Sequence, residues 1–95
     1  MLPRLADSYY DIRVEVHRAA RKHGVADADL LLAAEQAVYF AEPTEDPHRQ
    51  LRLGFSRTGV LLEVVVLTAD DGRELVIHAM KARRQYEKLL NEQGW

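Results

Sequence analysis

Side chains that can carry protons and hold phosphate gather between residues 78 and 86. They are His78, Lys81, Arg83, Arg84 and Tyr86. Cleavage of RNA without a metal needs a base for the 2′-hydroxyl proton, an acid for the leaving oxygen and cations for the phosphorane. Histidine is the natural proton carrier near neutral pH, and arginine makes bidentate contacts with phosphate. The same residues also have structural interpretations, as a hydrogen-bonded core histidine, a core aromatic and arginines paired with acids.

Other chemistries find little support in the residue types. The chain has no cysteine, which excludes disulfides, thiolate zinc sites, iron–sulfur clusters and cysteine nucleophiles. His17 and His23 are six residues apart without accompanying ligands, and His48 and His78 are isolated. The two serines lie outside any nucleophile-elbow context, and the glycines are scattered at turns. We therefore expect neither a metal nor a cofactor.

Composition indicates one small folded domain over residues 1–95. Hydrophobic residues make up 47% of the 95 residues and charged residues 29%, as is ordinary for a soluble protein. A core this small suggests that a partner adds stability. No apolar run approaches the roughly 20 residues that span a bilayer, and the N-terminus does not resemble a signal peptide. A cytoplasmic protein without membrane contact is expected.

The net charge of −2 argues against a strongly basic nucleic-acid binder. Charge is nevertheless arranged in blocks. Net positive charge falls in residues 13–23, 48–60 and 81–88, whereas residues 24–47 hold six acids and no base. The simplest interpretation is that each block is a solvated face. If the three basic blocks fold onto one face, they form a phosphate-binding patch.

Hydrophobic periodicity predicts the elements of the N-terminal half. Residues 1–8 look like a tail. The segment Asp11–Val16 alternates as a strand does, although a helical stripe also fits it. A short helix is predicted over His17–Lys22, with Gly24 following its end. A longer helix is predicted from an N-cap at Asp27 to Pro43.

The second half reads as three strands and a helix. The strands are predicted at Arg49–Phe55, Val60–Thr68 and Glu74–His78, joined by hairpins at residues 56–59 and 70–72. The last helix is predicted over Met80–Asn91. The order strand, helix, helix, three strands, helix predicts an α+β domain whose helices pack on one face of a small antiparallel sheet.

One acid interrupts the most apolar predicted strand. Glu63 lies in the middle of Val60–Thr68 and needs a partner there, because a polar group in a central strand is costly when it is unpaired. We predict an ion pair between Glu63 and Arg52 of the neighbouring strand, which could be structural or could orient a site, and we favour the structural role.

Three stretches together resemble BrnT-type toxins, within the wider RelE/ParE-like fold. They are Arg21-Lys22-His23-Gly24-Val25, the strand pair 51–54 and 59–65, and the segment from Val76 to Tyr86. The resemblance covers roughly residues 12–90. It implies a RelE-like fold and a toxin that cleaves messenger RNA and is neutralised by a small DNA-binding antitoxin.

The resemblance also suggests where the site lies. Carried over residue by residue, it implies Lys22, His23, Arg52, His78, Arg83 and Tyr86. Together with the cluster at residues 78–86, it leads us to assign catalysis to His78, His23, Arg83 and Tyr86. Binding of nucleic acid is assigned to Lys22, Arg52, Lys81 and Arg84.

Two other functions remain open at this point. The first is a non-catalytic module of the same fold that forms a stable complex with a partner protein or with a second copy of itself. The second is a DNA-contacting component of transcription, which the negative net charge disfavours. The toxin hypothesis itself implies a hetero-oligomer with the antitoxin, or a homodimer.

Overall fold

The computed structural model describes residues 14–41 and 48–92. Its elements are β1 (Val14–Val16), η1 (Arg18–Arg21), α2 (Asp27–Glu35), β2 (Tyr39–Ala41), β3 (Arg49–Phe55), β4 (Leu61–Thr68), β5 (Glu74–Lys81) and α3 (Arg84–Glu92). The predicted tail at residues 1–8, the predicted strand residues 11–13 and the acidic loop at residues 42–47 lie outside the described part of the chain.

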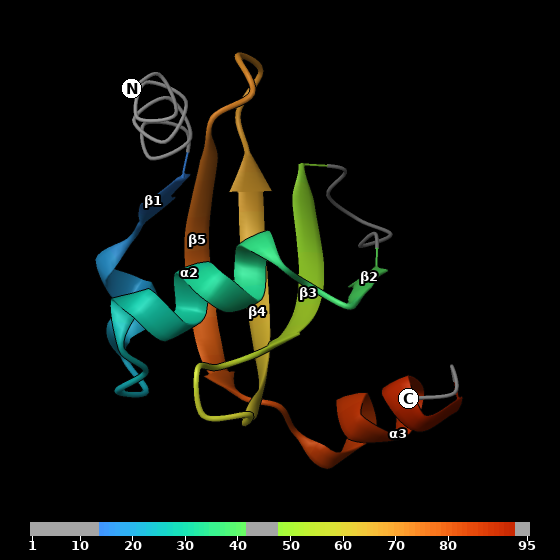
Figure 1. Ribbon diagram of the computed structural model, residues 1–95. Coiled ribbons are helices and arrows are strands. Elements are labelled where there is room, and N and C mark those ends of the chain that lie inside the picture. The colour runs from blue at the N-terminus through green and yellow to red at the C-terminus, as the bar shows by residue number, and fades with distance from the viewer. Residues whose placement is uncertain (1–13, 42–47, 93–95) are drawn as a thin grey trace, which may run out of the picture.

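The α+β class is confirmed, but the sheet is larger than predicted and mixed. Five strands pair in the order β1-β5-β4-β3-β2 (Figure 1). The three predicted strands form the antiparallel centre, β3-β4-β5. The prediction of a purely antiparallel sheet is wrong, because β1 pairs with β5 in parallel, with Val14 opposite Glu74. The predicted strand at Asp11–Val16 is confirmed in its described residues as β1, whereas β2, which pairs antiparallel with β3, was not predicted.

The main core lies between the sheet and the elements η1 and α2. Helix α2 crosses the middle of the sheet in Figure 1. The buried residues of this core are Ala20, Leu30, Ala33, Ala34, Leu62, Val64, Val66, Val76 and Ala79. In β4 they fall at every second position, as they must when one face of a strand is covered. The intervening residues, Glu63 among them, face the other side of the sheet.

Helix α2 is shorter than predicted. It ends at Glu35 and not at Pro43, and the backbone N–H of Gln36 donates the last hydrogen bond to the carbonyl of Leu32. After the helix, the backbone N–H of Val38 donates to the carbonyl of Leu53, and the chain continues as β2 beside β3. Pairing with an otherwise open strand edge therefore outweighs the helical pattern. The predicted N-cap also shifts by one residue, because Ala26 holds that position.

The other face of the sheet meets the start of α3. Strand β5 continues to Lys81, which lies opposite Leu62, so the last helix starts at Arg84 and not at Met80. Tyr86 in its first turn lines a hollow together with Leu51 and Val65, on the face away from α2. The prediction that all helices share one face is therefore wrong for α3.

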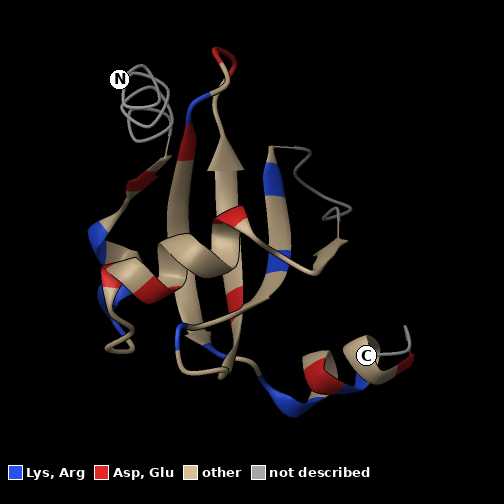
Figure 2. Ribbon diagram, viewed as in Figure 1, with Lys and Arg blue, Asp and Glu red and all other residues tan. Residues whose placement is uncertain are grey.

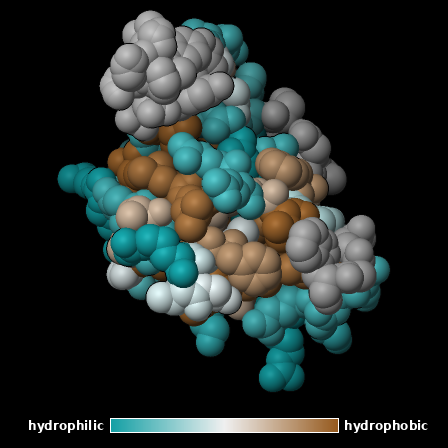
Figure 3. Space-filling view, in the orientation of Figure 1, coloured by the Kyte–Doolittle hydropathy of each residue, from teal (hydrophilic) through white to brown (hydrophobic). Residues whose placement is uncertain are grey.

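Apolar and hydrophilic residues are interspersed on the surface seen from the α2 side (Figure 3). Within the described residues, no helix has the length and apolar character needed to cross a membrane.

Gly54 of β3 lets α2 approach the sheet closely. A Cβ atom at this position would lie 2.8 Å from the Cα of Ala33 and closer still to its carbonyl oxygen. A glycine is therefore required at position 54, because the backbones of β3 and α2 lie too close together there for a side chain.

Replacing Gly54 by alanine is expected to lower the free energy of unfolding by about 2 kcal/mol, the usual cost of overpacking a core. The obstacle is backbone of α2, which cannot rotate away as a flexible side chain would. Urea denaturation of the two proteins measures the difference. An unchanged midpoint would show that α2 sits farther from β3 than the structure places it.

Candidate functional site

A buried carboxylate lies at the centre of the candidate site. Glu63 of β4 is 1% exposed and faces away from α2. Its Oε1 accepts hydrogen bonds from the backbone N and the Nε of Arg83, both at 3.0 Å. Its Oε2 accepts from Nη2 of Arg83 at 2.8 Å and lies 3.1 Å from Nε2 of His78. One carboxylate therefore joins β4, β5 and the start of α3.

The strand register explains how these residues meet. His78 of β5 lies opposite Val65, and therefore on the same face as Glu63. An irregularity in the pairing between Val65 and Val66 keeps His78 on this face. Beyond the end of β5, Ala82 N donates to the carbonyl of Leu61 at 2.9 Å. That bond places the next residue, Arg83, beside Glu63.

The carboxylate is held in its charged form. Burial raises the pKa of Glu63, but the hydrogen bonds from the Arg83 side chain and backbone and from His78 outweigh it. The net result is a pKa below the ordinary value for glutamate. The hydrogen bond to Glu63 raises the pKa of Arg83 in turn. At neutral pH the pair is therefore ionic.

A hollow of about 350 Å³ lies beside this carboxylate. Its lining combines an apolar floor with polar walls, made by Arg49, Leu51, Glu63, Val65, Ile77, His78, Arg83 and Tyr86. The guanidinium carbon of Arg83 lies 5.5 Å from the centre of the Tyr86 ring. The His78 side chain is 31% exposed and that of Arg83 is 53% exposed, so both are accessible to a ligand.

A second histidine approaches from outside the sheet. The ring of His23, just after η1, lies 5.7 Å from that of His78 between centroids, at an interplanar angle of 76°. Of the four residues assigned to catalysis from the sequence, His78, Arg83 and Tyr86 line the hollow, whereas His23 lies beside His78 but outside the lining. Two neighbouring imidazoles and a guanidinium can supply a base, an acid and a cation.

The residues assigned to nucleic-acid binding are more dispersed. Lys22, Lys81 and Arg84 are exposed, and none of them lines the hollow. Lys22 caps the end of η1 beside His23, and Lys81 and Arg84 flank Arg83. In Figure 2 the basic β3–β4 loop and the basic β5–α3 connection lie at the same end of the sheet. These three residues are close in sequence to His23 or Arg83, but they do not form the hollow.

Arg52 lies on the opposite face of the sheet and does not belong to the site. It is 8% exposed and donates to the backbone carbonyl of Ala34 at 2.8 Å, beneath α2. Its partner is Glu74, at 2.6 Å, and not Glu63. The predicted Arg52–Glu63 pair is wrong because Arg52 lies opposite Val64, and adjacent positions of a strand face opposite sides.

Sequence reasoning gave Glu63 the wrong partner and favoured a structural role for it over a role in the site. The same alternation was a usable signal, since Glu63 shares the parity of Val65 and Leu67 and not that of the core residue Val64. Arg49 was also missed, and at the start of a strand nothing in its spacing distinguishes it from an ordinary solvated arginine.

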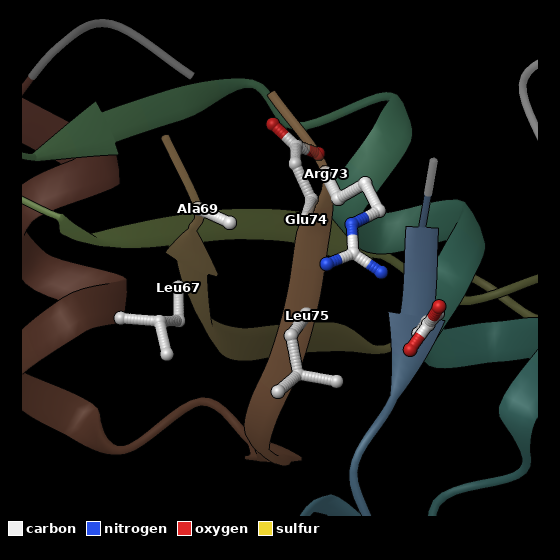
Figure 4. A pocket seen from close by; sticks show the side chains of 6 residues that line it. Leu67, Ala69, Arg73, Glu74 and Leu75 are labelled. Atoms are coloured by element: carbon white, nitrogen blue, oxygen red, sulfur yellow. The ribbon is translucent and has the colours of Figure 1, made fainter. Parts of the chain in front are cut away.

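A smaller hollow of about 140 Å³ lies at the other end of β5 (Figure 4). The described residues that line it are Glu15, Leu67, Ala69, Arg73, Glu74 and Leu75. These include no histidine. The larger hollow is therefore the better candidate for chemistry.

Metal ligands do not gather in the described part of the chain, where no three histidine or acidic side chains form a group. No protein-family model, curated protein or solved structure matches this chain. The resemblance to BrnT-type toxins therefore stays a prediction.

Proposed function

We propose that this chain is the toxin of a type II toxin–antitoxin pair and acts as a metal-independent endoribonuclease on messenger RNA. One observation carries the proposal. His78 and Arg83 line a hollow of about 350 Å³, and the ring of His23 lies 5.7 Å from that of His78 between centroids. Such a set contains every group that cleavage by the RNA's own 2′-hydroxyl requires.

The reaction follows from these groups. One histidine removes the proton of the 2′-hydroxyl, whose oxygen forms a bond with the adjacent phosphorus. The other histidine gives a proton to the 5′-oxygen as the bond between that oxygen and phosphorus breaks. Arg83 stabilises the charge that develops on the phosphorane. The products are a 2′,3′-cyclic phosphate and a 5′-hydroxyl, and both histidines are ready again after exchanging protons with water.

The surrounding cations hold the rest of the strand. Arg49 lines the hollow, and Lys22, Lys81 and Arg84 are exposed and close in sequence to His23 or Arg83. Contacts from lysine and arginine to phosphates position a nucleic acid without reading its sequence. Positive charge beside the hollow can attract an RNA strand although the whole chain has a net charge of −2.

The proposed partner is a small DNA-binding antitoxin made together with the toxin in the cytoplasm. Half-buried apolar residues on the face around the hollow, Leu51, Val65 and Ile77, offer such a partner a surface. A protein that covers them also closes the hollow to RNA.

The test is incubation of the purified chain with messenger RNA in the presence of EDTA. The expected result is cleavage to fragments that end in 2′,3′-cyclic phosphate. Expression of the chain without a partner is expected to arrest growth. Intact RNA together with normal growth would contradict the proposal.

The alternative is a non-catalytic module that binds a partner protein or a second copy. The observation in its favour is that Nε and Nη2 of Arg83 already donate hydrogen bonds to Glu63, as they would in an ion pair with a purely structural role. A stable complex that forms while RNA stays intact would support this alternative over the nuclease.

A further inference from the structure

The hydrogen bonds around Glu63 determine where the hydrogen of His78 lies. Glu63 is ionised, and an ionised carboxylate has only lone pairs, so it accepts hydrogen bonds and never donates one. Every atom that bonds to it must therefore bring a hydrogen. Nε2 of His78, 3.1 Å from Oε2, is such an atom.

A neutral imidazole carries one N–H and one lone pair. We propose that the Glu63 carboxylate fixes neutral His78 in the tautomer with hydrogen on Nε2, and so makes Nδ1 the atom that exchanges a proton with the substrate. The tautomer follows from the hydrogen-bond geometry around the ionised Glu63, whereas the role of Nδ1 in proton exchange rests on the proposed function. Glu63 is then a positioning residue, acting through His78.

The carboxylate is well suited to hold one orientation. Three donors of Arg83, its backbone N, Nε and Nη2, lie within 3.0 Å of the two oxygens. With Glu63 1% exposed, water does not compete for these bonds, and hydrogen bonds in such surroundings are strong. The Glu63 carboxylate, which Arg83 holds in one orientation, therefore holds the His78 imidazole in one orientation as well.

The chain contains a matched control for this arrangement. On the opposite face of the sheet, Glu74 accepts two hydrogen bonds from Arg52, at 3.2 and 2.6 Å. This is also an arginine–glutamate pair on strands of the sheet, and the structure describes no histidine bonded to that glutamate. Replacing Glu74 by glutamine therefore perturbs an ion pair without changing the hydrogen bond between Glu63 and His78.

The experiment is long-range ¹H–¹⁵N NMR of the full-length, ¹⁵N-labelled chain, at a pH where the His78 spectrum is that of a neutral ring. The expected spectrum shows a protonated Nε2 and an unprotonated Nδ1 in the wild type. Glu63→Gln is expected to populate both tautomers, because an amide both donates and accepts. Glu74→Gln is expected to leave the His78 signals of the wild type.

Cleavage kinetics give a second readout. Glu63→Gln is expected to lower kcat by about 10- to 100-fold, the usual effect of removing a group that orients a histidine. KM is expected to stay near its wild-type value, because Glu63 lies beneath the hollow and does not hold phosphate.

The outcomes separate the two proposals. A wild-type His78 with hydrogen on Nδ1 would overturn the tautomer assignment while leaving the nuclease function standing, and this measurement decides even if Glu63→Gln does not fold. A folded Glu63→Gln with an unchanged His78 spectrum would overturn it equally. A wild type that leaves RNA intact would remove the nuclease function and the role of Nδ1, but not the tautomer.

Discussion

Replacing His78 by glutamine is expected to slow RNA cleavage by about 10²- to 10⁴-fold, the usual contribution of a positioned acid or base. The glutamine amide can still donate to Glu63, so the hydrogen bond that the ring makes at 3.1 Å is preserved. What the amide cannot do is take up and release a proton near neutral pH. The measurement is the single-turnover rate of cleavage of a defined messenger RNA.

His48→Gln is the matched control for this experiment. His48 is exposed and does not line the hollow, so its replacement is expected to leave the cleavage rate unchanged. Equal unfolding midpoints for both variants would confirm that the fold is retained. Cleavage by His78→Gln at the wild-type rate would remove His78 from the mechanism.

Replacing Arg83 by methionine is expected to lower the free energy of unfolding at pH 7 by more than the roughly 1 kcal/mol that bounds a surface ion pair, because it leaves the buried carboxylate of Glu63 with fewer partners. The cost arises at Glu63, which is 1% exposed and loses the donors Nε and Nη2. The backbone N–H of residue 83 and the ring of His78 still donate to it, and they limit the loss. Urea denaturation measures the difference.

The Arg73–Asp71 pair provides the control for this prediction. Both side chains are 58% exposed, and Arg73→Met is expected to cost less than about 1 kcal/mol, as surface pairs do. Equal losses in the two variants would show that the burial of Glu63 does not govern the energy of its ion pair.

The loss caused by Arg83→Met is also expected to depend on pH. In the wild type the folded state lowers the pKa of Glu63, so the stability that Glu63 contributes is present above its unfolded pKa and is lost as pH falls through the folded pKa. Without the Arg83 side chain, burial raises the pKa of Glu63 with less to oppose it. The difference between the two proteins is therefore expected to shrink below about pH 4. A difference that is the same at pH 7 and pH 3 would contradict this.

Much of the sheet was predictable from local pattern. The alternation in Arg49–Phe55 predicts β3 to the residue, and the apolar run that ends at Thr68 predicts β4 to within one residue. Glycines at positive φ end both hairpin loops, with φ of 84° at Gly59 and 90° at Gly72. These features depend on neighbours in sequence, for which period and turn chemistry are sufficient.

The errors share one cause, which is competition from distant parts of the chain. The stripe that runs past Glu35 is compatible with a helix, yet Tyr39–Ala41 finds a strand edge to pair with in β3. Met80 begins a helical stripe, yet it lies opposite Glu63 in the sheet, and β5 continues through it. In both places the pairing of remote strands overrides a local preference.

The candidate site divides along the same line. By itself, the sequence determined which side chains with catalytic chemistry the chain has, and it showed that an acid interrupts its most apolar strand. Only the tertiary structure decided that this acid, Glu63, binds Arg83 and His78 and not Arg52. The physical reason is that successive side chains of a strand point to opposite faces of the sheet, and the β4–β5 register decides which residues are paired across the two strands. An offset of one residue therefore moves a partner to the other side of the sheet.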